Sequence, residues 1–298
     1  MSRTVILMYH RVAAVVPDPY GIAVSPTHFA EHVAHLVALD CVVPLQEVHR
    51  PSPALRVAIT FDDGYRDNAT TAAPLLAEHG LPATFFITTG RLGGQRFWWD
   101  RLGHALLGDH PLPDAIDVRV GRQDLWLDLH TPQARETSLR FLHRRLRPLS
   151  PDELDETVEP VLAALAAPEP PEDARSMTDA QLQVLAREPL FEIGAHTRTH
   201  LQLNRQDPRL QRAEVAGSVE DLTTALGRPI TSFAFPFGSP GAVGPLGPGL
   251  ATEAGCLRAV STDRGLVTAD SPRYLLPRIG VEDWDGPAFA EALAAVTR

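Results

Sequence analysis

The alternation of short apolar runs with helix-like stretches is the feature that most constrains the fold of this chain. Apolar runs this short are typical of strands that are buried on both faces of a parallel sheet. The pattern therefore predicts an α/β fold whose sheet is open or closed into a barrel. The seven predicted strands are residues 5–9, 56–61, 81–88, 191–195, 233–235, 259–261 and 279–281.

Helix-start signals support this alternation and reveal one interruption of it. Ser25 followed by Pro26 predicts a helix start, because the serine side chain accepts free N–H groups and proline suits the first helical position. Between residues 97 and 175 the strand pattern gives way to helical stretches, one of which begins at Ser150. We interpret 97–175 as a helical insertion, or lid, within a single domain that spans residues 1–298.

Composition excludes several classes of function. The net charge of −10 argues against a nucleic-acid partner, because phosphate binding needs dense basic patches. The chain contains no lysine. This excludes enzymes that bind pyridoxal phosphate through a Schiff-base lysine and NTPases that need a P-loop lysine. The two cysteines, Cys41 and Cys256, lie far apart without metal-ligand spacing and are interpreted as core residues in a reducing compartment.

The sequence also bears on location. No apolar run approaches the roughly 20 residues that cross a bilayer, so we expect no membrane insertion. The first residues lack a basic leader followed by an apolar segment and a cleavage site, so we expect a cytoplasmic protein.

Two adjacent carboxylates follow the second predicted strand. Asp62 and Asp63 stand directly before Gly64, where the strand gives way to a turn. Adjacent carboxylates repel each other unless a cation or a proton is shared, so one of them can bind a metal while the other acts as a general base. The alternative interpretation is an ordinary helix N-cap pair with a turn glycine.

Two histidines follow the fourth predicted strand at an i, i+4 spacing. His196 and His200 can converge on one metal ion, and Asp63 would complete an Asp-His-His set with positions open for water and substrate. The spacing alone is a weak signal, because His28 and His32 share it in the first helix, where we interpret them as surface residues. What distinguishes the later pair is its position directly after a strand.

A third candidate lies in the turn after the fifth predicted strand. Pro236 and Phe237 precede Gly238 there, and such a turn can direct backbone N–H groups into a cleft as an oxyanion hole requires. An ordinary turn is the alternative. Residues 238–249, rich in glycine and proline, are predicted to form a loop.

Taken together, these motifs resemble the polysaccharide deacetylase family, also called carbohydrate esterase family 4. The resemblance covers roughly residues 60–90 and 176–282 and leaves the helical segment as an insertion. The matching phrases are TFDDGY (60–65), PATFF (82–86), FEIGAHT (191–197), HTRTH (196–200), FAFPFG (233–238) and LPRIGV (276–281).

The resemblance implies a distorted (β/α) barrel of about seven strands with one divalent metal, usually Zn²⁺ and in some members Co²⁺ or Ni²⁺. It makes Asp63, His196 and His200 the metal ligands and Asp62 the general base that deprotonates the attacking water. The Phe237 N–H would hold the oxyanion. The implied reaction removes an N-acetyl or other N-acyl group from an amino sugar or a glycan precursor.

The sequence departs from the family pattern in two places. The family commonly has an arginine that orients the base just before the proline of the third motif, where this chain has Ala234. Arg278 can substitute for it, or it is a surface or structural arginine. The usual Leu-x-His that supplies the general acid is also absent, since no histidine follows His200. His10 is its predicted replacement, as in the biofilm poly-N-acetylglucosamine deacetylases that the chain resembles, unless it is a buried structural histidine.

Other interpretations remain open. Trp98 and Trp99, at the start of the insertion, either stack on sugar rings or anchor the lid as core aromatics. The substrate is an N-acylated sugar or glycan precursor, or instead a small N-acylated metabolite or a nucleotide- or lipid-linked sugar. A narrow pocket would favour the small substrates and a long groove would favour a polymer. A catalytically silent glycan-binding module is a further alternative.

Overall fold

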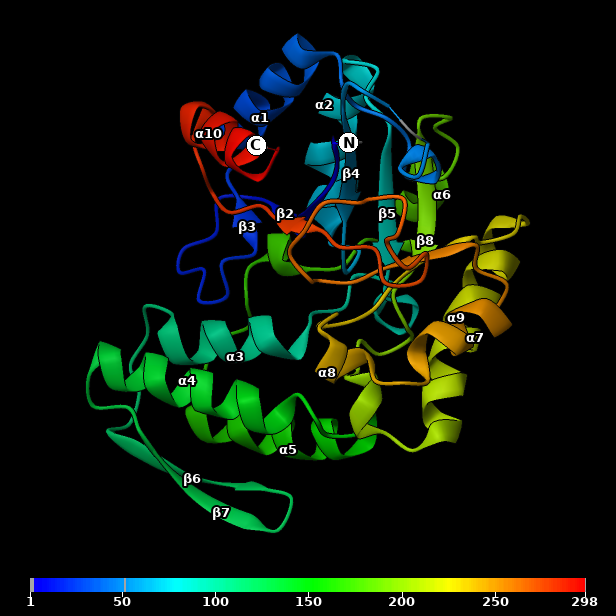
Figure 1. Cartoon of the computed structure of the whole chain (residues 1–298). Helices are drawn as coiled ribbons and strands as arrows, with labels where there is room; N and C mark the ends of the chain where they lie inside the picture. Colours follow the sequence, from blue (N-terminus) through cyan, green and yellow to red (C-terminus); the bar gives the residue numbers. More distant parts are fainter. Residues whose placement is uncertain (1–2, 51, 298) are drawn as a thin grey trace.

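The computed structural model describes residues 3–50 and 52–297, and its main element is a seven-stranded parallel sheet. All seven predicted strands are present, in the spatial order β10-β9-β8-β5-β4-β1-β11. Figure 1 shows β4, β5 and β8 side by side in this sheet. Every pairing in this sheet is parallel, as the uninterrupted apolar runs predict. The strands are β1 (Arg3–Tyr9), β4 (Leu55–Phe61), β5 (Ala83–Ile87), β8 (Phe191–Ala195), β9 (Ser232–Ala234), β10 (Arg258–Val260) and β11 (Ile279–Gly280).

The sheet curls into the distorted (β/α) barrel that the sequence predicts. Its edge strands, β10 and β11, are linked by the segment that precedes β11, because Leu276 forms a parallel bridge with Val260. The Leu276 N–H donates to the Ala259 carbonyl at 3.0 Å, and the Leu276 carbonyl accepts from Ser261 at 2.9 Å. This last passage of the chain therefore touches both edges of the sheet and brings Arg278 to the barrel interior.

Helices cover the outside of the barrel, and the first of them begins at the predicted cap, Ser25. Ser25 caps the first helix through a hydrogen bond from His28 N–H, and Asp207 caps the longest one in the same way. Stacked rings of Tyr9, Phe61 and Phe85 join neighbouring strands inside the main core, with centroids 5.3 and 4.9 Å apart. The covering helices are α1 (Pro26–Leu39), α2 (Ala73–Glu78) with a π-helical turn at Asn68–Ala72, α6 (Asp179–Leu185), α7 (Pro208–Leu226) and α10 (Gly286–Thr297).

The segment from 97 to 175 forms a separate layer with its own hydrophobic core (Figure 1). It contains the predicted helices, and also an antiparallel hairpin that the sequence analysis did not predict. The hairpin strands alternate partly buried and exposed side chains and pack their inner face on α5 and α4. The elements are α3 (Trp98–Leu107), β6 (Ala115–Val120), β7 (Gln123–Asp128), α4 (Pro132–Leu146) and α5 (Pro151–Leu165).

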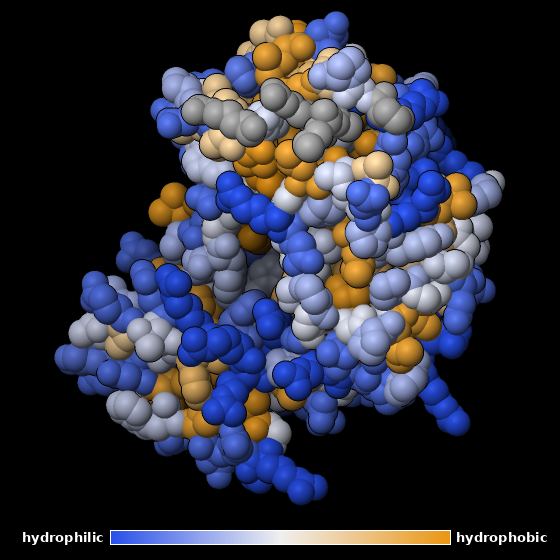
Figure 2. Space-filling model, viewed as in Figure 1, coloured by the Kyte–Doolittle hydropathy of each residue, from blue (hydrophilic) through white to orange (hydrophobic). Residues whose placement is uncertain are grey.

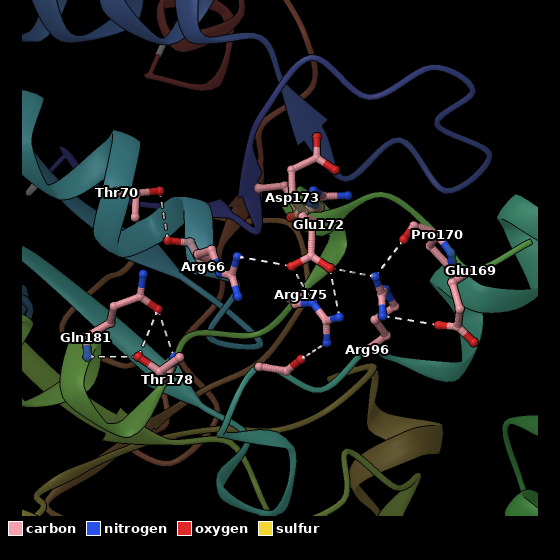
Figure 3. A network of polar contacts seen from close by, with 12 residues as sticks. Arg66, Thr70, Arg96, Glu169, Pro170, Glu172, Asp173, Arg175, Thr178 and Gln181 are labelled. Atoms are coloured by element: carbon pink, nitrogen blue, oxygen red, sulfur yellow. Dashed lines mark hydrogen bonds and ion pairs between the residues drawn. The ribbon is translucent and has the colours of Figure 1, made fainter.

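An ion-pair cluster joins the two ends of this insertion to the barrel (Figure 3). The Glu172 carboxylate accepts from Arg175 at 2.8 Å and from Arg96 at 3.3 Å, and lies 3.6 Å from Arg66. Arg96 and Arg175 also form an antiparallel backbone bridge, so the chain leaves and re-enters the barrel side by side. Exposed pairs contribute little singly, but this network fixes where the insertion sits over the barrel.

Two sequence interpretations of the fold were wrong. Residues 238–249 are not a plain loop, because α8 (Pro240–Val243) and the start of α9 (Gly247–Glu253) lie there, each with a proline in its first turn. His32 is fully buried rather than a surface residue, since its ring stacks on Phe289 at 4.1 Å and bonds with the Tyr9 hydroxyl.

A two-stranded sheet of β2 (Arg11–Val12) and β3 (Ala23–Val24) completes the strands. Within the described ranges no helix is long and apolar enough to span a bilayer.

Candidate active site

The paired carboxylates lie at the carboxyl end of β4 and point in different directions. Asp63 adopts a left-handed backbone with φ of 71°, and Gly64 follows with φ of 83°. This turn ends the strand, so that Asp62 faces the barrel interior while Asp63 faces the loop after β8. Both carboxylates are almost completely buried, at 2% and 3% exposure. Two charges placed so deeply need partners, and each carboxylate has a different one.

The two histidines come from an irregular loop after β8, not from a helical turn. Thr197 and His200 both have left-handed backbones, with φ of 61° and 62°. His196 and His200 do converge, but the i, i+4 spacing does not reflect one turn of a helix here. The carboxylate of Glu214, on α7, fixes this loop by accepting from the N–H groups of Arg198 and Thr199, both at 2.8 Å. The loop conformation is thus imposed by a buried acid from a distant helix.

Asp63, His196 and His200 form a cluster that could hold one metal ion. The Asp63 Oδ1 atom lies 3.4 Å from His196 Nε2 and 3.2 Å from His200 Nε2. Tetrahedral ligands at about 2.05 Å from a zinc ion are separated by roughly 3.3 Å, so these spacings fit a shared divalent cation. The buried Asp63 Oδ1 also has no hydrogen-bond donor within the described part of the chain, which is what a metal ligand needs.

The orientation of His196 supports the same assignment. Its Nδ1 bonds with the Ala234 carbonyl at 2.7 Å, which requires the proton on Nδ1 and leaves the Nε2 lone pair directed at Asp63. A backbone acceptor behind a histidine is the usual support for a metal ligand. Ala234, which the sequence analysis placed at the position of the family's arginine, contributes its carbonyl oxygen to this contact.

Arg278 lies behind Asp62 and is fully buried. Its guanidinium donates to both carboxylate oxygens of Asp62, at 2.7 and 2.6 Å, and its Nε donates to the Ser261 carbonyl at 2.7 Å. It is therefore not a surface residue. Burial alone would raise the pKa of Asp62, but the Arg278 charge outweighs that effect and holds the pKa below its usual range. Asp62 is accordingly ionised at neutral pH.

His10 follows β1 and reaches the same pocket. The pocket has a volume of about 230 Å³ and includes His10 together with both aspartates and both histidines of the cluster. The position of His10 is fixed through its backbone, since its carbonyl accepts from the Asn68 side chain at 2.7 Å. Figure 2 shows the surface hollowed between the barrel and the insertion. The remaining lining residues are Tyr20, Ile22, Trp99, His143, Phe237 and Thr262.

The turn after β9 places Phe237 in the pocket wall and buries Pro236 beneath it. Phe237 has a left-handed backbone with φ of 58°, and its carbonyl accepts from the Thr262 hydroxyl at 2.9 Å. No acceptor for the Phe237 N–H is found within 3–50 and 52–297. The group is therefore available to a ligand, as an oxyanion-hole donor must be.

The two tryptophans are buried, each at 5% exposure, and belong to the core of the insertion. Trp99 nevertheless lines the pocket, where its ring lies 4.6 Å from that of His200, and its indole N–H donates to the Tyr65 hydroxyl at 2.8 Å. Trp98 is not part of the pocket wall and stacks on His143 instead. The anchoring interpretation thus fits both residues.

Sequence reasoning missed several residues of this site. Glu214 and Thr262 support motif residues from outside any motif, and Tyr20 and His143 form part of the pocket wall. The sequence carries one weak signal that His143 could face the protein interior: it directly follows Leu142, which belongs to the buried stripe of its helix. Its contact with a barrel loop depends on how the insertion folds back.

Comparison with known proteins supports the motif analysis. Residues 49–243, more than half of the chain, match the family described as polysaccharide deacetylase. This chain belongs to that family. Members of the polysaccharide deacetylase family are hydrolases that act on N-acetyl groups. No curated protein matches the sequence significantly.

Solved structures of other deacetylases share the fold of this family member at low sequence identity. The deacetylase PplD of Streptococcus pyogenes, in complex with acetate, is 17% identical with a TM-score of 0.62, covering 99% of this chain and 98% of its own. IcaB from Ammonifex degensii is also 17% identical, with a TM-score of 0.62 and coverages of 100% and 98%. The polysaccharide deacetylase BC0361 from Bacillus cereus is 15% identical, with a TM-score of 0.63 and coverages of 98% and 69%.

Proposed function

We propose that this protein is a metal-dependent N-deacetylase that removes the acetyl group from an N-acetylated amino sugar. The observation that carries the proposal is the Asp63, His196 and His200 cluster beside a separately held Asp62, within one pocket. One carboxylate is thus available to a cation and the other to a proton. Family membership supports the reaction class.

Each residue has a chemical task in this proposal. A divalent ion held by the cluster, Zn²⁺ or else Co²⁺ or Ni²⁺, would polarise the acyl carbonyl and acidify water. Asp62 accepts a proton from the water that adds to the carbonyl carbon, and the Phe237 N–H donates to the developing oxyanion. His10 donates a proton to the leaving amine nitrogen as the C–N bond breaks, which releases acetate and a free amine.

Arg278 acts on Asp62 and does not reach the substrate. Its two hydrogen bonds use one lone pair on each carboxylate oxygen, so each oxygen keeps another for a proton. A guanidinium on both oxygens also fixes the plane of the carboxylate. Arg278 therefore takes the positioning task of the arginine that Ala234 replaces.

The small pocket supports a substrate that presents a single acylated unit. At about 230 Å³ it is below the usual range of roughly 300–1,000 Å³ for small-molecule sites, and the insertion covers it through Trp99 and His143. This small volume favours the second candidate function, deacylation of a small N-acylated metabolite or of a nucleotide- or lipid-linked sugar. The cytoplasmic location predicted from the sequence is compatible with either small substrate.

A metal-loaded acetate-release screen tests the proposal. It compares N-acetylglucosamine, its oligomers, nucleotide-linked N-acetylglucosamine and small acylated amines, with bound metal measured on the same samples. We expect release from a sugar, and none from the matched Asp63→Asn variant, which loses a ligand. If the protein binds metal and releases no acetate from any amide, the result would support the catalytically silent glycan-binding module instead.

A further inference from the structure

One residue of the insertion stands in the pocket without any task in the reaction described above. His143 lies on α4, and its ring is packed between Tyr20 and Trp98, with centroids 5.0 and 5.2 Å away. The Phe237 ring lies 6.3 Å from it on the third side. The imidazole is thus fixed in one place by aromatic neighbours from the insertion, an N-terminal loop and the barrel.

The polar atoms of this ring have no protein partner. Neither ring nitrogen of His143 makes a hydrogen bond with any residue in the part of the chain that the structure describes, although the ring lines the pocket. Burial lowers the pKa of His143 to about 4, with the Arg147 charge acting in the same direction. At neutral pH the ring is therefore uncharged, with one nitrogen as donor and the other as acceptor.

The second insertion residue in the pocket wall cannot provide such a contact. The indole N–H of Trp99 is already used by the Tyr65 hydroxyl at 2.8 Å. His143 is thus the polar contact that the insertion offers to a ligand in the pocket. It lies on the insertion side of the pocket, opposite the barrel strands that carry Asp62 and Asp63, and contributes to the same lining as they do.

We propose that His143 binds the substrate through a ring nitrogen, by a hydrogen bond with a hydroxyl group of the acylated sugar unit. The inference rests on the proposed function and adds a specificity determinant to it. A substrate with a hydroxyl at this position makes the bond, whereas an acyl compound without sugar hydroxyls does not. The insertion then selects a sugar from among acylated compounds, while the barrel performs the hydrolysis.

Two substrates and three variants of the full, metal-loaded chain test the proposal. N-acetylglucosamine carries both the acetyl group and the sugar hydroxyls, whereas 4-nitrophenyl acetate carries an acetyl group on a nitrophenyl ester without sugar hydroxyls. His143→Phe keeps an aromatic ring between Tyr20 and Trp98 but removes both nitrogens. His143→Asn and His143→Gln each restore a polar amide, near the Nδ1 and the Nε2 position respectively.

We expect His143→Phe to lower kcat/KM for N-acetylglucosamine about tenfold, mainly through KM, the effect of one lost hydrogen bond. Hydrolysis of the acetate ester should change less than twofold, and one of the two amide variants should recover most of the loss on the sugar. Equal losses on both substrates, or no loss on either, would overturn the proposal. A thermal unfolding scan of each variant checks that packing is retained.

A binding measurement separates this inference from the proposed function. Titration of N-acetylglucosamine into the metal-loaded wild type and into His143→Phe compares affinities whether or not acetate is released. We expect about a tenfold higher Kd for the variant. If the wild type releases no acetate but the variant binds the sugar more weakly, the proposed reaction fails and the His143 contact stands. Equal affinities, or no binding of the sugar to the wild type, would refute the contact.

Discussion

Replacing Arg278 by methionine should destabilise the protein strongly, and the structure allows the loss to be divided. Arg278→Met leaves the buried Asp62 carboxylate without its counter-charge, a change that typically costs about 3–5 kcal/mol. It also removes the donors to the Ser261 carbonyl and the Thr60 hydroxyl, at about 1 kcal/mol each. We therefore expect the total loss at pH 7 to be about 5–7 kcal/mol.

The double variant Asp62→Asn with Arg278→Met isolates the part that comes from the buried charge. Its loss should fall to about 3 kcal/mol, since the Ser261 carbonyl, the Thr60 hydroxyl and the neutral amide at position 62 then lack a partner but no buried charge is left unpaired. Urea denaturation of metal-free protein measures all three free energies of unfolding. If the single and the double variant lose the same stability, the ion pair does not carry the energy assigned to it here.

Three further predictions concern individual groups. Asp62→Asn should keep the bound metal and lower kcat about 10²–10⁴-fold, whereas an active variant would remove Asp62 from the role of base. His10→Ala should also slow turnover with unchanged metal content, and an unchanged rate would move the general acid elsewhere. Burial raises the pKa of Asp100 to about 7. In the folded protein Asp100 therefore keeps a proton that it loses near pH 4 in the unfolded chain, so the free energy of unfolding falls as the pH rises from 4 to 7. The Asp100→Asn side chain can still accept from the Tyr65 hydroxyl. The variant should therefore be more stable than the wild type at pH 8, by up to about 4 kcal/mol, and nearly equal to it at pH 4. Urea denaturation at both pH values measures this difference.

The parallel sheet was predictable because its determinants are local, whereas its distorted barrel form was implied by the family resemblance. Each strand is buried on both faces, so each appears in the sequence as an apolar run, and the motif residues follow the strands directly. The hairpin at 115–128 was missed because its strands are half exposed and combine charged with apolar residues. The sequence pattern of a strand is weak where only one face is covered.

The supporting contacts of the site could not be predicted in the same way, because they join residues far apart in the chain. Arg278 is 216 positions from Asp62, and no local rule distinguishes its bidentate role from that of a structural arginine. The family resemblance only suggested it as a substitute. Glu214 and His143 reach the site by the packing of α7 and α4, which depends on the whole fold.

Backbone conformation is a further property of the site that residue types conceal. Of the six non-glycine residues with left-handed backbones in the described chain, four belong to the site: Asp63, Thr197, His200 and Phe237. Each costs about 1–2 kcal/mol relative to an ordinary conformation, so together they require substantial compensation. The hydrogen bonds of Glu214 to the histidine loop and of Thr262 to the Phe237 carbonyl supply part of it. Since the folded protein holds these backbones before any ligand arrives, the residues proposed as metal ligands and oxyanion donor are positioned in advance, and binding need not reorganise them.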